Sequence, residues 1–168
     1  MKIQSLILLL PLVILTNGLY SQALRTKVDK LNYVNASITE YKRKTNFKAT
    51  EFICRPRNPD TKKGFALFGF TSTCYMDISI PQNPAVGVYK IEGESLSSYA
   101  AFYYTTEGQR RSYKTGKCAY SFGQIEITEI VGKLIKGKFS FVASKFLSPC
   151  TPQNKFEVTG TFQTTFTN

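Results

Sequence analysis

Apolar and polar residues alternate with a period of two in the C-terminal part of the chain. One parity of residues 155–166 is the set Phe156, Val158, Gly160, Phe162, Thr164 and Phe166. The other parity is the set Lys155, Glu157, Thr159, Thr161, Gln163 and Thr165. This period is typical of a β-strand with one buried and one solvated face.

Similar runs precede this strand along the chain. Apolar residues occupy every second position in residues 139–143 and 125–127. Two more strand-like runs occupy residues 86–91 and 99–104. Residues 64–81 are predicted to form one long strand. One face of this strand would carry Phe68, Phe70, Cys74, Met76, Ile78 and Ile80. Gly69 and the cluster Thr71-Ser72-Thr73 would bend or bulge it. Residues 27–44 fit either a helical turn or a strand.

Turn-forming residues separate these runs, at 58–60, 81–84, 107–108, 132–133 and 148–150. No segment has a sustained apolar stripe of helical period. We therefore expect an all-β fold, an antiparallel β-sandwich of about seven to nine strands, with an open β-barrel as the alternative. The chain of 168 residues would form a single domain over residues 22–168.

The N-terminus has the features of a secretory signal peptide. Lys2 is followed by an apolar run over residues 6–15 and then by small and polar residues. The run is too short to span a bilayer. We expect cleavage of residues 1–21 after Ser21, or alternatively after Ala23. The mature protein would be soluble and located in the periplasm, at the cell surface or outside the cell. The first cysteine is Cys54, so no lipid anchor is expected after the signal.

The four cysteines of an exported chain predict two disulfides. Four cysteines allow three pairings. If residues near 125 and 139 form a hairpin with its turn at 132–133, Cys118 and Cys150 lie together at its open end. Cys54 and Cys74 would then pair with each other. A metal site or redox function is not expected, because no Cys-x-x-Cys pair is present.

Composition argues against several kinds of chemistry. The chain has no histidine, so catalytic triads with His and zinc sites with His are excluded. It also lacks a Gly-x-Ser-x-Gly elbow and a phosphate-binding loop. The closest carboxylate pairs are Glu126 with Glu129 and Glu92 with Glu94, and neither accompanies a recognisable catalytic motif. We expect no catalytic residue, no cofactor and no metal.

Positive charge is the strongest compositional signal. There are 22 Lys and Arg residues against 11 Asp and Glu, giving a net charge of +11 and a pI near 9.6. One basic cluster is interleaved with tyrosines and is the candidate partner-binding surface: Tyr103, Tyr104, Arg110, Arg111, Tyr113, Lys114 and Lys117. Such a surface attracts acidic groups, although the excess charge could serve solubility alone. Nothing resembles a nucleic-acid recognition element.

Residues 99–104 allow two interpretations. Tyr99, Ala101 and Tyr103 share one side of a strand, and Ala100, Phe102 and Tyr104 share the other. Aromatic residues on both sides fit a strand with one packed and one binding face. A strand packed between two layers explains the same residues.

Several strand motifs carry a resemblance to a known family. They are Val86-Gly87-Val88-Tyr89, Gly123-Gln124-Ile125-Glu126-Ile127-Thr128, Gly137-Lys138-Phe139-Ser140-Phe141 and Thr159-Gly160-Thr161-Phe162. The chain resembles small envelope proteins and lipoproteins of unknown function from Bacteroidota. It departs from them at Val28-Asp29-Lys30, where they have a glycine, in lacking a lipid-bearing cysteine and in having four internal cysteines. The resemblance implies a β-sandwich in a bacterial envelope and assigns no catalytic residue.

Two functions remain as hypotheses. The first is a non-catalytic binding or assembly module that docks onto another envelope or outer-membrane protein through a basic, Tyr-rich face. The second is a β-sandwich that binds or hydrolyses an acidic glycan or lipopolysaccharide. An enzyme would need a concave pocket with two convergent carboxylates. A single glycosylation sequon, Asn35-Ala36-Ser37, leaves a secreted eukaryotic protein as a third possibility.

Overall fold

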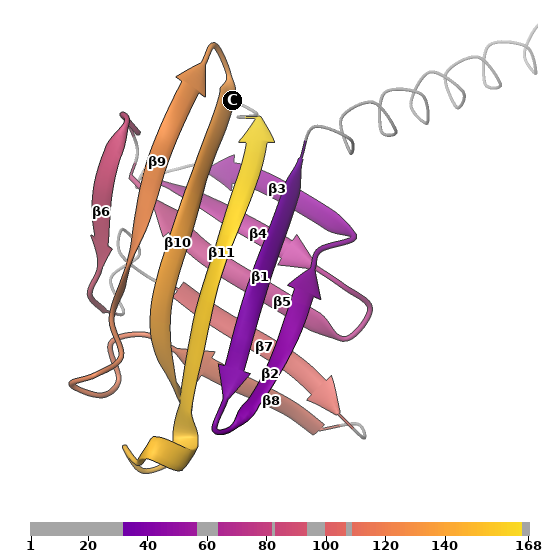
Figure 1. Ribbon diagram of the computed structural model, residues 1–168, viewed down its shortest axis with the longest axis vertical. Coiled ribbons are helices and arrows are strands. Elements are labelled where there is room, and N and C mark those ends of the chain that lie inside the picture. Colours follow the sequence, from indigo (N-terminus) through magenta and orange to yellow (C-terminus); the bar gives the residue numbers. More distant parts are fainter. Residues whose placement is uncertain (1–31, 57–63, 82, 94–99, 107–108, 166–168) are drawn as a thin grey trace, which may run out of the picture. The chain divides into compact units, whose positions relative to one another are not determined.

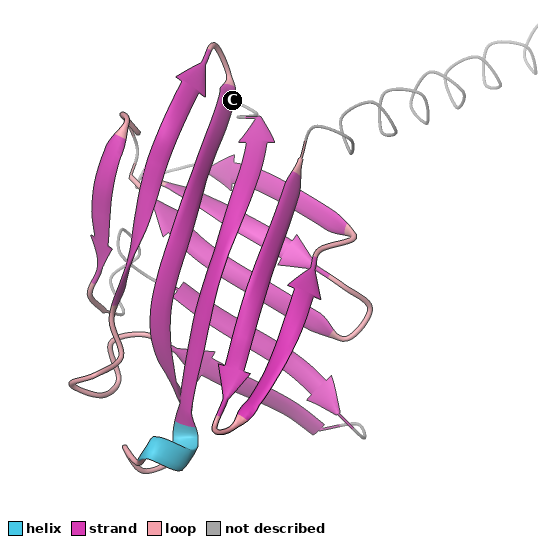
Figure 2. Ribbon diagram, in the orientation of Figure 1, coloured by secondary structure: helices cyan, strands magenta, loops and turns pink. Residues whose placement is uncertain are grey.

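The computed structural model describes residues 32–56, 64–81, 83–93, 100–106 and 109–165. The predicted signal peptide lies outside these residues. The described part is almost entirely β-structure, with one short 3-10 helix at Pro152–Asn154 (Figure 2). The all-β prediction is confirmed. This part of the chain contains no helix of the length and apolarity that a membrane crossing requires.

Eleven antiparallel strands form one curled sheet that folds into a half-barrel of two layers. The first layer has the order β6-β9-β10-β11-β1-β2. Its strands are β6 (Gly87–Ile91), β9 (Gly123–Val131), β10 (Leu134–Lys145), β11 (Lys155–Thr165), β1 (Tyr33–Glu40) and β2 (Arg43–Lys48). The second layer has the order β8-β7-β5-β4-β3. Its strands are β8 (Gln109–Lys114), β7 (Ala100–Thr106), β5 (Cys74–Ile80), β4 (Phe65–Phe70) and β3 (Glu51–Pro56).

The strands of the two layers cross at a steep angle (Figure 1). At one corner β10 joins both layers, because it pairs with β9 over most of its length and with β8 at Ser144 and Lys145. At another corner the chain passes directly from β2 to β3 through Ala49 and Thr50. Gly69 of β4 permits a close approach to β1, since a Cβ atom there would lie 2.6 Å from Val34 Cγ1. Strands that switch layers at corners are typical of orthogonal sheet packing.

The core between the layers confirms the main period-2 predictions. On β11 the side chains of Phe156, Val158 and Phe162 are buried, and the neighbouring positions of the other parity are exposed or half-buried. The predicted apolar faces of the β9–β10 hairpin are buried in the same core. Its turn contains Gly132 with φ of +58°, a left-handed conformation that favours glycine. Of residues 27–44, which fitted either a helical turn or a strand, the part from 33 to 44 belongs to the β1–β2 hairpin, and residues 27–31 lie outside the described residues.

The prediction of one long strand over residues 64–81 is wrong. The chain turns at residues 71–73 and forms the β4–β5 hairpin, so the strand count exceeds the seven to nine expected. The turn also reverses the parity: Met76 and Ile78 belong to the core, whereas Phe68 stacks on Tyr75 on the opposite face. A polar cluster after an apolar run is more consistent with a turn than with a bulge.

The cysteines confirm one predicted disulfide and contradict the other. Cys118 and Cys150 are bonded, with their Cα atoms 5.8 Å apart. Cys54 and Cys74 are not joined. Cys54 pairs with Leu67, which pairs with Ile78, so Cys74 lies two strands away and four residues along. That offset is about 13 Å along the strand alone, beyond the roughly 7 Å limit on Cα separation in a disulfide.

Candidate functional site

The β7–β8 hairpin carries most of the predicted partner-binding residues. Tyr104 pairs with Arg111, and Phe102 pairs with Tyr113. Because side chains alternate between the faces of a strand, the hairpin divides the predicted cluster in two. Tyr103, Arg110 and Lys114 lie on the outer face of the second layer. Tyr104, Arg111 and Tyr113 lie on its inner face. The structure therefore does not bring the predicted residues together on one surface.

The outer face carries a row of aromatic rings across three strands, which we call the aromatic row: Phe68, Phe70, Tyr75 and Tyr103. The centroid of the Tyr75 ring lies 5.1 Å from the centroid of the Phe70 ring and 5.2 Å from that of the Tyr103 ring. These three rings are partly exposed, whereas Phe68 is buried. The row lies beside a hollow of about 280 Å³. It is a rigid, partly solvent-accessible aromatic surface.

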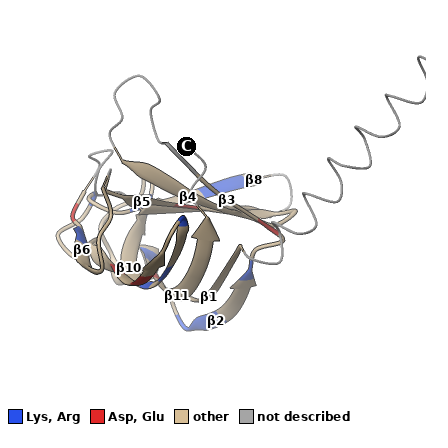
Figure 3. Cartoon of the chain, turned by 90° about the horizontal axis from the view of Figure 1, so that it is seen from above, with Lys and Arg blue, Asp and Glu red and all other residues tan. Residues whose placement is uncertain are grey.

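Arg110 ends the aromatic row on its β8 side. Its guanidinium carbon lies 4.7 Å from the centroid of the Tyr103 ring, within the range of a cation–π interaction. Lys114, on the same face of β8, places its ammonium group 4.3 Å from the centroid of Phe146. Figure 3 shows basic residues along β8 and also along β2. Arg110 is exposed, so its charge remains available to a partner.

The inner face contains a hydrogen-bonded cluster centred on Glu40, at the end of β1. The hydroxyl of Tyr104 lies 3.0 Å from each carboxylate oxygen of Glu40, and the Tyr113 hydroxyl also donates to this carboxylate. Arg111 Nη1 donates to the Tyr104 oxygen over 3.4 Å. The two tyrosine rings stack with their centroids 6.0 Å apart. The cluster links β1 of the first layer to β7 and β8 of the second.

The surroundings of the cluster raise two pKa values. Burial raises the pKa of Tyr113, and its hydrogen bond to Glu40 raises that pKa further. Tyr113 is therefore a hydrogen-bond donor throughout the physiological pH range. The hydrogen bond to Tyr104 is the main cause of the raised pKa of Arg111.

Glu40 was missed by the sequence analysis. Its partners Tyr104 and Tyr113 lie 64 and 73 residues away in the chain, and the β1 region had no unambiguous strand pattern. A carboxylate at the polar end of an apolar alternation, Val34-Ala36-Ile38, was the available signal. Only the pairing of the layers shows that this acid meets two tyrosines.

Lys117 has a structural role beside the disulfide. Its ammonium group donates to the backbone oxygen of Lys145 over 2.9 Å and also to that of Ser148. Both carbonyls precede Cys150, which is bonded to Cys118. Lys117 thus holds the segment after β10, and it belongs to neither face of the β7–β8 hairpin.

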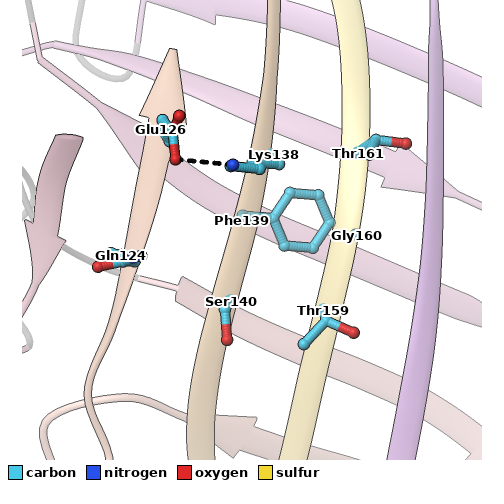
Figure 4. Close-up of a pocket in the computed structure, with 8 residues that line it drawn as sticks. All are labelled: Gln124, Glu126, Lys138, Phe139, Ser140, Thr159, Gly160 and Thr161. Atoms are coloured by element: carbon cyan, nitrogen blue, oxygen red, sulfur yellow. Dashed lines mark ion pairs between the residues drawn. The ribbon is translucent and has the colours of Figure 1, made fainter. Parts of the chain in front are cut away.

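The candidate catalytic carboxylates are paired with lysines on the strands. Glu126 lies 3.1 Å from Lys138, and Glu129 lies 2.9 Å from Lys136. The Glu126–Lys138 pair borders a hollow of about 430 Å³ on the outer face of the first layer (Figure 4). Glu126 is its only lining carboxylate among the described residues. Glu92 lies 3.4 Å from Lys90, and Glu94 is outside the described residues.

No group of three His, Cys, Asp or Glu side chains that could hold a metal ion occurs in the described parts of the chain. The described residues offer two different surfaces: a partly exposed aromatic and cationic outer face, and an inner cleft of about 410 Å³ bordered by Glu40, Tyr104 and Arg111.

A family model described as "Domain of unknown function (DUF6252)" matches residues 35–168. The chain belongs to this family. No curated protein and no solved structure matches the chain. The DUF6252 region contains all strands from β2 to β11 and nearly all of β1, and it includes the aromatic row, Arg110 and the Glu40 cluster. Both surfaces are therefore parts of the DUF6252 domain itself.

Proposed function

We propose that this DUF6252 protein is an exported, non-catalytic binding module of a bacterial cell envelope, of the kind found in Bacteroidota, and that it is not lipid-anchored. It docks onto an acidic surface of another envelope or outer-membrane protein. The docking surface is the outer face of the second layer, formed by Phe70, Tyr75, Tyr103 and Arg110. The observation that carries the proposal is Arg110 stacked on Tyr103 at the exposed end of the aromatic row.

The residue types of this surface favour a protein partner. Tyrosine and arginine are enriched at protein interfaces and dominate their binding energy. The ring of Tyr75 packs against both Phe70 and Tyr103, so these partly exposed side chains lose little entropy on binding. A net charge of +11 would also accelerate association with an acidic partner.

The geometry of the carboxylates supports a non-catalytic function. A glycosidase needs two carboxyl groups on either side of the scissile bond. In this chain Glu126 and Glu129 each pair with a lysine of β10, and the hollow beside Glu126 has one carboxylate among its lining residues.

Affinity capture from native cell envelopes tests the docking surface. Three tagged mature proteins are compared: the natural sequence, Arg110→Glu and Lys133→Glu. Lys133 is exposed in the β9–β10 turn of the other layer, so it serves as a surface control. Both variants lower the net charge equally, because each replaces a basic residue with glutamate. We expect one stoichiometric acidic protein with the natural sequence and with Lys133→Glu, and at least a tenfold lower recovery with Arg110→Glu.

Three other results would contradict the proposal. Equal loss of capture in both variants would show that only net charge matters. Capture that survives protease treatment of the envelopes and is released by an acidic polysaccharide would favour the glycan-binding alternative. Capture of no protein at low salt would also overturn docking, because ionic attraction is strongest there.

A further inference from the structure

A cleft opens between the two layers where the β1–β2 hairpin faces β5, β7 and β8. It has a volume of about 410 Å³ and lies at the opposite face of the β7–β8 hairpin from the aromatic row. Its apolar walls are Ile38, Phe47, Phe102 and Phe156. Its polar border includes Glu40, Tyr104 and Arg111 of the Glu40 cluster, together with Arg43 and Thr45.

The layers separate at this end of the core. Thr45 and Arg43 have the same parity on β2 as the core residue Phe47, so all three face inward. Phe47 is 4% exposed, whereas Thr45 and Arg43 are exposed to solvent. On the facing layer Arg111 is also an inward-facing, exposed residue. Inward-facing residues that stay exposed mark an entrance to the apolar interior.

The charges at the entrance favour an anion. Both oxygens of Glu40 accept hydrogen bonds from tyrosine hydroxyls, so this carboxylate is already satisfied. The ion pairs among the described residues include neither Arg43 nor Arg111. Two guanidinium groups against one carboxylate leave a local excess of positive charge. Guanidinium groups bind carboxylates through paired hydrogen bonds.

We propose that this cleft binds a small amphiphile, whose apolar chain lies against the packed rings of Phe47, Phe102 and Phe156 at the cleft wall and whose carboxylate head lies between Arg43 and Arg111. The volume falls within the range of small-molecule pockets, which are mostly apolar with a few placed polar groups. The proposal concerns the inner face and does not depend on docking by the outer face.

The chain contains its own reporter for occupancy of the cleft. Cys74 lines the cleft and is partly exposed. Cys54 is buried in the core, and burial raises the pKa of its thiol to about 12, so it reacts slowly with a maleimide. Cys74 also lines the hollow beside the aromatic row, so slower modification of Cys74 by N-ethylmaleimide reports occupancy of the cleft only where it is lost in the Arg43→Gln and Arg111→Gln variant.

The test uses octanoate, octanol and octylammonium with the mature protein, below their micelle concentrations. We expect octanoate to slow the modification of Cys74 at least fivefold and to bind saturably by calorimetry. Affinity should rise about fourfold per added methylene from hexanoate to octanoate. The double variant Arg43→Gln and Arg111→Gln should weaken octanoate at least tenfold and octanol less than twofold.

A steric pair of variants distinguishes the cleft from other binding sites. Thr45→Trp fills the entrance at an exposed position and should abolish octanoate binding. Thr159→Trp, on the exposed outer face of β11, is its matched control and should bind normally. The absence of saturable octanoate binding, tighter binding of octylammonium, or equal effects of the two tryptophans would overturn the proposal.

Discussion

The two faces of the β7–β8 hairpin present the same pair of residue types in different surroundings. On the outer face Arg110 stacks 4.7 Å from the Tyr103 ring and remains exposed. On the inner face Arg111 lies 5.8 Å from the Tyr104 ring, and the tyrosine hydroxyl is bound to Glu40. One face thus offers aromatic surface and charge to a partner. The other uses a tyrosine to connect two layers.

The difference shows how a carboxylate changes the role of an Arg–Tyr pair. Without an acid beside it, an exposed arginine on a ring keeps its charge for an incoming anion. With Glu40 nearby, the tyrosine hydroxyl binds the carboxylate, and hydrogen bonds of this kind hold the two layers together. The hairpin can therefore serve binding and stability at the same time, on opposite faces.

The largest expected contrast is between Phe102 and its neighbour Tyr103. Phe102 is 2% exposed in the core, so Phe102→Ala should lower the free energy of unfolding by about 3–5 kcal/mol. Tyr103→Ala on the outer face should lower it by about 1 kcal/mol or less. Urea denaturation measures both. Equal losses would mean that the outer face is also a packed interior.

Removal of the Glu40 carboxylate should have the next largest effect. Glu40→Ala leaves two tyrosine hydroxyls without their acceptor and should cost about 2–3 kcal/mol, since hydrogen bonds to charged groups are the stronger ones. Glu40→Gln keeps an acceptor and should cost less. Arg110→Ala on the exposed outer face is the control, with a change within about 0.5 kcal/mol. If alanine and glutamine cost the same at position 40, the tyrosine hydroxyls do not depend on the carboxylate.

The core thiol should give a smaller, pH-dependent effect. Burial raises the pKa of Cys54 from 9.0 to about 12, so between these values the unfolded chain releases a proton that the folded chain retains. Stability from this residue is complete below pH 9 and declines toward pH 12. Comparison with Cys54→Val by denaturation at pH 8 and pH 10.5 should show an extra loss of about 1–2 kcal/mol in the natural protein. A parallel decline in both proteins would show that Cys54 does not cause it.

Thiol counting provides a direct check of the cysteine arrangement. The non-reduced, unfolded protein should contain two reactive thiols, because Cys118 and Cys150 are bonded and Cys54 and Cys74 are not. In the folded protein the thiol of Cys74 should react first. A count of zero would restore the second disulfide and would require an arrangement in which β4 does not separate β3 from β5.

The smallest expected effect is the coupling free energy between Tyr103 and Arg110 on the outer face. A double-mutant cycle of Tyr103→Leu and Arg110→Met should give a coupling free energy of about 0.5–1 kcal/mol, typical of an exposed cation–π pair. The corresponding cycle at Tyr104 and Arg111 should give a different value, because Glu40 interacts with both residues. Identical values would remove the distinction between the two faces.

Much of the fold could be predicted from local patterns. The alternation at residues 155–166 and the glycine turn at 132–133 identified the β9–β10–β11 meander, because strand parity and turn geometry are local properties. The same meander brought Cys118 to Cys150. The prediction from local pattern was wrong at residues 64–81, because the alternation of faces was continued across the turn at residues 71–73. The error placed Phe68 and Phe70 on the same face as Met76 and Ile78, whereas the turn puts them on opposite faces of the layer.

The candidate site depended on pairings between distant strands. Sequence identified Tyr103, Tyr104, Arg110, Arg111 and Tyr113 as one basic, aromatic cluster, and it could not show that the hairpin divides them between two faces of a layer. Charge and strand periodicity can be read from the amino acids alone. The Glu40 cluster, the open cleft and the unjoined cysteines require the crossing of the two layers. Contacts over 64 to 73 residues arise from that packing and leave no local pattern.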